Sequence, residues 1–239
     1  MSIGAFNTSL KEAQIFLSNV NLFKSLGIKV INKDDVSQEF KSASQKNDYF
    51  KLYKCALANF DYDILLSDDS IFQFSYKVNR GHLPFIRYAF FQNPQEYKSY
   101  EEYLENLREL GIVEEETNEE IGNSFENDYQ QFLTEQNVNT SSTSIRYDLD
   151  YSNYQPLVHS VSHLHIGHAN NIRIPCDKIL TPLKFTVFVL KHVYYYQWKD
   201  LVETGNVYLS ECLKSTKLNC PQLTAAHWKV TETKELFLT

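Results

Sequence analysis

The sequence contains no long apolar run. None of its hydrophobic stretches reaches the roughly 20 residues that a membrane-spanning helix requires, and its N-terminus lacks the basic region and apolar core of a secretory signal. These absences argue against a protein that crosses or enters a membrane. We therefore expect a soluble, cytoplasmic protein without a membrane partner.

Cysteine is scarce, with 4 residues in a chain of 239, and no two of them form a Cys-x-x-Cys pair. This spacing argues against the disulfide framework of a small secreted domain, so we expect reduced thiols. Cys176 lies close to a histidine-rich stretch and could be a metal ligand there, although a buried free thiol is the commoner situation.

Two widespread catalytic motifs are also missing. The chain has no glycine-rich phosphate-binding loop, and it has no Gly-x-Ser-x-Gly sequence around a nucleophilic serine. The second absence argues against a hydrolase of the nucleophile-elbow class. Any reaction on a phosphate must therefore use other groups.

Positive charge is in deficit, and the deficit is local. The net charge is −7, which disfavours non-specific binding to a phosphate backbone. Residues 92–137 hold thirteen acidic and two basic residues, whereas residues 143–200 hold six basic and four acidic ones. The second region could therefore still face an anion.

What the chain has in abundance is aromatic residues, with 16 Tyr and 16 Phe, and hydrophobic residues make up 43% of it. This composition excludes a disordered protein and is sufficient for a large core. We expect a single domain over residues 1–239, with an N-terminal helical part (about 1–60) and a central to C-terminal part that carries a candidate site (about 143–200). The fold class that we predict is α+β, a mainly antiparallel sheet with helices packed on one face and at both ends.

Periodicity places the main elements. Residues 70–78 and 83–91 alternate between two faces and predict a hairpin. Ser9 and Glu12 read as a capping box that opens a helix, and Gly27 as the residue that ends it. We expect a short strand or an extended link at 28–31 and an exposed polar stretch at 32–45. Further helices are predicted at 47–59, 94–110, 125–136 and from Thr181-Pro182 onward.

Two histidines form the centre of the candidate site. His163 and His165 are two apart in a run rich in β-branched residues, so on a strand both imidazoles point to one face. In the preceding strand Arg146, Asp148 and Asp150 share a face in the same way. The connection between the two strands is short and polar, which favours antiparallel neighbours. We therefore expect the two sets of side chains to line one surface.

Three more residues flank this cluster. A third strand at 172–175 carries Arg173 on its polar face, and His159 and His168 stand on either side of the histidine pair. We assign substrate binding to Arg173, His159 and His168. The catalytic assignment goes to His163, His165, Asp148 and Arg146.

The cluster is compatible with two chemistries. His163, His165 and Asp148 could hold a divalent metal such as Zn, which activates water and polarises a phosphoryl group. Without metal, one histidine could act as base and the other as acid while Arg146 or Arg173 neutralises a phosphate. Against both stands a purely structural interpretation, in which these side chains form a satisfied polar layer.

Four segments resemble an uncharacterised bacterial family that is known only as a domain of unknown function. They include Ser-Asp-Asp-Ser at 67–70, Ile-Arg-Tyr at 86–88, Arg-Tyr-Asp at 146–148 and His-Leu-His-Ile-Gly at 163–167. This resemblance covers most of the chain and implies no activity. Residues 144–167 are in addition similar to small toxins of bacterial toxin–antitoxin pairs, which implies a nuclease of a conflict or anti-phage defence system.

Three functional hypotheses follow. The first is a phosphodiester- or nucleotide-directed enzyme, such as a toxin-like nuclease. The second is a non-catalytic interaction subunit or antitoxin-like partner that docks a protein of a defence or toxin–antitoxin operon through its aromatic surface and acidic middle. The third is a sensor in which Arg146 and Arg173 hold an anionic nucleotide without turnover.

Overall fold

The computed structural model describes residues 1–27, 36–46, 48–78, 83–94, 100–109, 111–112, 125–131, 143–168, 172–205 and 207–238. The chain divides into two compact units. The first comprises Met1–Asn93 together with Thr143–Thr239, and the second comprises Pro94–Ser142. In the described part of the chain no helix is long and apolar enough to cross a bilayer.

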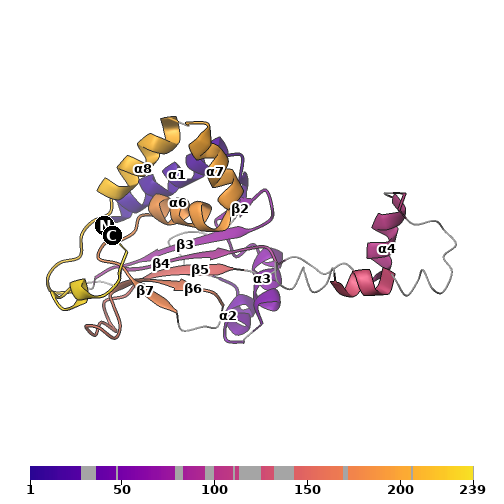
Figure 1. Ribbon diagram of the computed structural model, residues 1–239. Helices are drawn as coiled ribbons and strands as arrows, with labels where there is room; N and C mark the ends of the chain where they lie inside the picture. The colour runs from indigo at the N-terminus through magenta and orange to yellow at the C-terminus, as the bar shows by residue number, and fades with distance from the viewer. Residues whose placement is uncertain are drawn as a thin grey trace. The chain divides into compact units, whose positions relative to one another are not determined.

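The first unit is built on a seven-stranded antiparallel sheet (Figure 1). Its strands lie side by side in the order in which they follow one another in the sequence. They are β1 (Phe23–Leu26), β2 (Ile64–Leu66), β3 (Ile71–Lys77), β4 (Phe85–Phe91), β5 (Ser144–Leu149), β6 (Ser162–Ile166) and β7 (Arg173–Pro175). The hairpin predicted at 70–91 is β3 and β4, and the three predicted central strands are β5, β6 and β7.

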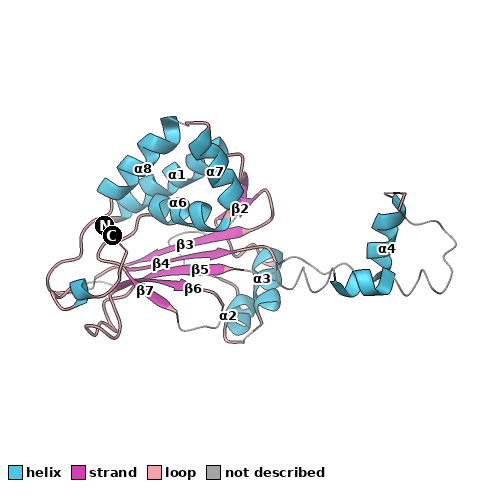
Figure 2. Cartoon of the chain, in the orientation of Figure 1, coloured by secondary structure: helices cyan, strands magenta, loops and turns pink. Residues whose placement is uncertain are grey.

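Helices cover one face of this sheet (Figure 2). Alternate positions of β3 and β4 send aromatic rings such as Phe72, Phe74 and Tyr88 to that face, where they are fully buried. The covering helices are α1 (Ile3–Asn19), α6 (Pro182–Val193), α7 (Tyr195–Glu203) and α8 (Val207–Leu218). Together with the antiparallel sheet, this layer confirms the predicted α+β fold.

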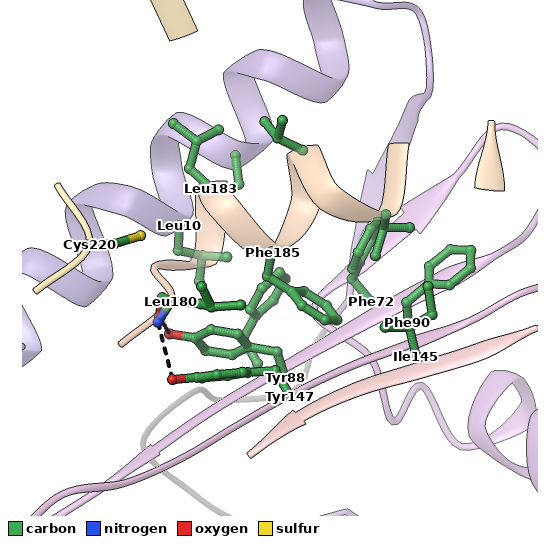
Figure 3. Close-up of a cluster of buried hydrophobic side chains, with 14 of the residues drawn as sticks. Leu10, Phe72, Tyr88, Phe90, Ile145, Tyr147, Leu180, Leu183, Phe185 and Cys220 are labelled. Atoms are coloured by element: carbon green, nitrogen blue, oxygen red, sulfur yellow. Dashed lines mark hydrogen bonds between the residues drawn. The ribbon is translucent and has the colours of Figure 1, made fainter. Parts of the chain in front are cut away.

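The middle of the core is tied by hydrogen bonds as well as by packing (Figure 3). Tyr88 and Tyr147 stack with ring centroids 5.2 Å apart. The Tyr88 hydroxyl donates to the Leu180 carbonyl at 3.1 Å, and the Leu180 amide donates to the Tyr147 hydroxyl at 3.1 Å. Both buried hydroxyls are thus satisfied, and they fix the segment that leads into α6.

The opposite face is covered only in part. At one end α2 (Gln38–Ser44) and α3 (Tyr49–Ala58) pack on it through a second, smaller core. Ile71, Ala89 and Phe91 of the sheet meet Phe40 and Leu52 of the helices in this core. The remainder of the face carries polar side chains and contains the candidate site.

The second unit is described only where it is helical. Its helices are α4 (Tyr100–Glu109) and a segment at 125–131. Tyr129 of that segment lies 5.2 Å from the Tyr100 ring and 5.4 Å from the Tyr103 ring. Helix α4 lies within the helix predicted at 94–110, and the segment at 125–131 lies within the helix predicted at 125–136. Residues 95–99, 110 and 132–136 of these two predictions lie outside the described residues.

The predicted capping box at Ser9 is wrong. The first helix begins at Ile3, and its N-cap is Ser2, whose side chain accepts a hydrogen bond from the Ala5 amide. Ser9 is a buried residue inside this helix, and its hydroxyl accepts a bond from the Leu183 amide at 3.0 Å. The hydroxyl therefore caps α6, which is distant in sequence, and not its own helix.

Gly27 does not end a helix. It follows β1, and its amide donates to the Asp63 carbonyl at 2.9 Å. A Cβ at this position would lie 1.8 Å from the Tyr62 carbonyl oxygen, so only glycine permits the two backbones to approach. The short strand or extended link predicted at 28–31 lies outside the described residues.

Helix α2 was not expected, because residues 32–45 are mostly polar. Ser37 caps it by accepting from the Phe40 amide at 3.0 Å, and Phe40 alone buries its side chain in the second core. By contrast, Thr181 is the N-cap of α6 with Pro182 at the first helical position, as predicted.

Candidate functional site

The site lies on the polar face of the sheet, where register places its residues in two transverse rows. In one row Arg87, Asp148 and His163 are successive cross-strand partners in β4, β5 and β6. In the neighbouring row Arg146 pairs with His165, which pairs with Arg173 of β7. Cross-strand partners on one face are in direct contact distance, so the sheet itself assembles the cluster.

Asp148 is the centre of this cluster. Arg87 Nε donates to its Oδ1 at 2.7 Å, and Arg146 Nε donates to its Oδ2 at 2.9 Å. His165 Nε2 lies 3.3 Å from Oδ2. The carboxylate is buried whereas the two arginine side chains are roughly half exposed. The guanidinium groups therefore reach solvent while a buried carboxylate holds them in place.

The surroundings of Asp148 decide its charge. Burial alone would raise the pKa of this carboxyl, but the hydrogen bond from His165 and the two guanidinium groups outweigh burial and hold the pKa well below its usual range. Asp148 is therefore ionised at neutral pH. A buried carboxylate with this set of donors also fixes the directions of all three partners.

His163 has a defined tautomer. Its Nδ1 lies 2.8 Å from the Ser160 carbonyl oxygen, which can only accept, so Nδ1 carries the proton and Nε2 has a lone pair. Burial, followed by the neighbouring His165, lowers the pKa of His163 to about 4. At neutral pH this imidazole is uncharged and able to accept a proton.

The flanking histidines occupy different positions. The ring of His163 lies 4.8 Å from His165 on one side and 4.8 Å from His159 on the other, so His159 extends the row of imidazoles. His168 instead lies 5.5 Å from the Tyr49 ring, beside α3. Asp150 accepts bonds from Ser152, which makes it a turn residue next to the cluster.

Two pockets open on the cluster. A pocket of about 190 Å³ is bounded by the imidazoles of His159, His163 and His165, and the guanidinium groups line it too. A pocket of about 630 Å³ extends from the same residues toward α2. The two share Arg87, Arg146, His165 and Arg173 as lining residues, so they adjoin each other on the same face of the sheet. His163 and His165 are buried and His159 is half-buried, but all three line the smaller pocket, which sets them apart from sealed core residues.

A metal ion does not fit this arrangement well. One ligand atom each of Asp148, His163 and His165 lies within 4.8 Å of the others, and this ligand set is one that Zn accepts. However, tetrahedral ligands about 2.0 to 2.2 Å from Zn must stand closer together than this. Both carboxylate oxygens of Asp148 are also engaged by guanidinium groups, whose charge repels a cation.

Cys176 takes no part in the cluster. It is fully buried, and burial raises the pKa of its thiol to about 12. The side chains whose ligand atoms converge are Asp148, His163 and His165, without Cys176, so this residue is a core thiol. All four cysteines are free, as predicted.

The residue that was not predicted from the sequence is Arg87. Together with Arg146 it donates to the Asp148 carboxylate. The tripeptide Ile-Arg-Tyr occurs at 86–88 and again at 145–147. In β4 and β5 the tyrosines of both copies pack in the core, while both arginines turn to the site. The repeat was therefore the signal.

Lys41 and Lys46 line the larger pocket and are exposed. Lys41 belongs to the polar stretch 32–45 that was predicted to be exposed, and Lys46 follows it; no role in the site was predicted for either.

The chain belongs to the family described as "Uncharacterized conserved protein (DUF2290)", whose model matches residues 13–235. This match spans the sheet, the cluster and most of the covering helices. No match to the chain was found among curated proteins or among solved structures. The family therefore comes without an activity, and any functional argument must come from the site.

Proposed function

We propose that this protein is a phosphodiester-directed enzyme that uses its two central imidazoles for acid–base catalysis. The observation that carries the proposal is the composition of one hollow: neutral His163 and Asp148-bound His165 lie with centroids 4.8 Å apart among three arginines. A base, an acid and positive charge for a phosphoryl oxygen are the parts that phosphodiester cleavage requires.

Each residue has a role in this proposal. His163 accepts a proton at Nε2, because its Nδ1 is held by Ser160. His165, oriented by Asp148, donates a proton to the leaving oxygen. Arg87 and Arg146 are half exposed and already positioned by the same carboxylate, so they bind the phosphate without reorganisation.

The local charge supports an anionic substrate. Three guanidinium groups line the smaller pocket, and among the described residues Asp148 and Asp150 are the acidic ones there. In a chain of net charge −7, a hollow with excess positive charge attracts anions against the overall field. We further propose that the enzyme is a toxin-like nuclease of a bacterial conflict system.

The test is nuclease activity on pooled single-stranded RNA and DNA, with EDTA present. We expect the wild-type protein to cleave at least one pool, and His163→Ala and His165→Ala to lose more than about a hundredfold of the rate. His192→Ala, a change on the exposed side of α6, is the control and should keep the activity. Loss of activity in EDTA and recovery with Zn would instead assign the metal mechanism.

A nucleotide sensor is the second candidate, because the same arginines could bind an anion without turnover. It predicts saturable binding of a nucleotide by calorimetry, abolished in Arg146→Ala, and no product on prolonged incubation. An antitoxin-like role predicts a partner complex that survives both histidine substitutions. Equal cleavage by wild type and both histidine variants would refute the enzymatic proposal.

A further inference from the structure

The larger pocket continues the candidate site toward α2, and its charge is one-sided. Of its described lining residues five are cationic, namely Lys41, Lys46, Arg87, Arg146 and Arg173, and none is acidic. At about 630 Å³ it is much larger than one phosphate needs. The volume and the cationic lining together suit an anion larger than a single phosphate.

The pocket also offers neutral hydrogen-bonding groups and an apolar wall. Ser44, Gln45 and Gln73 line it together with Phe40 and Phe91 of the second core. Amide and hydroxyl groups of this kind bind sugar hydroxyls, and apolar walls accept bases. A volume of about 630 Å³ is in the range of sites that enclose a small ligand, so a base with its sugar could enter it but a base-paired duplex could not.

The site has few means of activating an outside water. Asp148 is held by Arg87 and Arg146, and Asp150 accepts bonds from Ser152 and Asn153, so neither carboxylate is available as a base. The remaining candidate bases are imidazoles, and His163 is the one whose lone pair is assigned to Nε2. A nucleophile that belongs to the substrate needs no separate capture, because it is already next to the phosphorus at very high effective concentration.

We propose that the substrate is single-stranded RNA lying along the adjoining pockets, and that the nucleophile is the 2′-hydroxyl next to the scissile phosphate. This inference rests on the proposed function and adds its substrate class. The 2′-hydroxyl gives its proton to His163 Nε2, and the 2′-oxygen forms a bond to phosphorus. The bond from phosphorus to the 5′-oxygen breaks, and that oxygen takes a proton from protonated His165. The products are a 2′,3′-cyclic phosphate end and a 5′-hydroxyl end.

The decisive experiment compares three random-sequence pools of single-stranded oligonucleotides in EDTA. The first is DNA, the second is DNA with one central ribonucleotide, and the third carries a 2′-O-methyl group at that ribonucleotide. We expect cleavage of the second pool alone, directly after the ribonucleotide, with a cyclic phosphate end at early times by mass spectrometry. His163→Ala should abolish it.

The outcomes separate the inference from the proposed function. Cleavage of the DNA or the 2′-O-methyl pool at a similar rate would overturn RNA specificity and leave the phosphodiesterase proposal standing. Absence of cleavage in all three pools and in a fully ribonucleotide pool would overturn both. A linear phosphate from the earliest time points would overturn the internal nucleophile.

The path of the strand has its own test. Binding of uncleavable 2′-O-methyl RNA is measured by fluorescence anisotropy for the double variant Lys41→Glu, Lys46→Glu. We expect the affinity of the double variant to fall about tenfold or more. Its salt dependence should also weaken, because a protein with fewer phosphate contacts releases fewer counterions on binding. Lys11→Glu, an exposed lysine of α1 outside the pocket, is the matched control. Unchanged affinity in the double variant would overturn the path along α2.

Discussion

At the scale of residues, one buried carboxylate, that of Asp148, holds the polar side chains of the candidate site together. Asp148 satisfies two guanidinium groups and one imidazole, and without it three positively charged or protonatable groups would stand in one hollow. A buried charge is costly unless it is paired and hydrogen-bonded. Here the pairing also leaves the outer edges of both arginines free for a ligand, so the same contacts serve stability and binding.

The low pKa of His163 has a consequence for stability. Its pKa is about 4 in the folded protein against about 6.5 for an unperturbed histidine, so between these pH values the unfolded chain binds a proton that the folded protein does not. Folding stability should therefore be complete above pH 6.5 and fall as the pH drops to 4. The loss attributable to His163 is at most about 3 kcal/mol.

Urea unfolding at pH 7 and pH 4.5 measures this effect. In His163→Gln the difference in unfolding free energy between the two pH values should be smaller than in the wild-type protein. The matched control is His227→Gln, since His227 meets the Tyr151 ring edge-on and is not among the residues that line the smaller pocket. An unchanged difference in His163→Gln would show that this imidazole does not remain neutral in the fold.

At the scale of elements, one close approach holds the edge of the sheet. Gly27→Ala should lower the free energy of unfolding by about 2 kcal/mol or more, because the new Cβ would lie 1.8 Å from the Tyr62 carbonyl oxygen. Gly4→Ala is the control, since its Cβ would meet nothing closer than 3.9 Å within α1. That change should be neutral or stabilise by up to about 1 kcal/mol. Denaturant titration of both variants decides, and equal stabilities would contradict the structure.

The elements that could be predicted from the sequence are those whose pattern is set by the sheet. Strict alternation in residues 70–78 and 144–149 identifies β3 and β5, and it also identifies which side chains share the site face. What local pattern could not show is tertiary. Ser9 has the sequence of a cap, but its hydroxyl is used by Leu183, which is distant in the chain.

The same limit explains the site residues that were missed. Arg87 joins Asp148 only through the pairing of β4 with β5, and a long stretch of sequence separates these strands. Lys41 and Lys46 reach the hollow because one phenylalanine, Phe40, anchors a short polar helix. Neither fact has a periodic signature, since both depend on which surfaces meet.

At the scale of the whole molecule, residues 94–142 are an insertion between adjacent strands. The Gln92 amide donates to the Thr143 carbonyl at 3.1 Å, and the Thr143 amide donates to the Gln92 side chain at 3.0 Å. The chain thus leaves and re-enters the sheet at neighbouring positions. The acidic segment could be removed there without stretching either strand.

We expect replacement of residues 94–142 by a loop of about four residues to leave the first unit folded. Its free energy of unfolding should stay within about 1 kcal/mol of the wild-type value, because a shorter connection costs slightly less closure entropy. Denaturant unfolding and the near-ultraviolet circular dichroism of the tyrosine-rich core are the measurements. A loss of cooperative unfolding would show that the two units depend on each other.

The order of the strands in the sheet determines when the cluster can form during synthesis on the ribosome. The cluster draws on β4, β5, β6 and β7, which pair in the order of synthesis. A ribosome-bound chain that ends before Arg173 lacks the last of its guanidinium groups. The cluster can therefore be completed only after Arg173 has been synthesised.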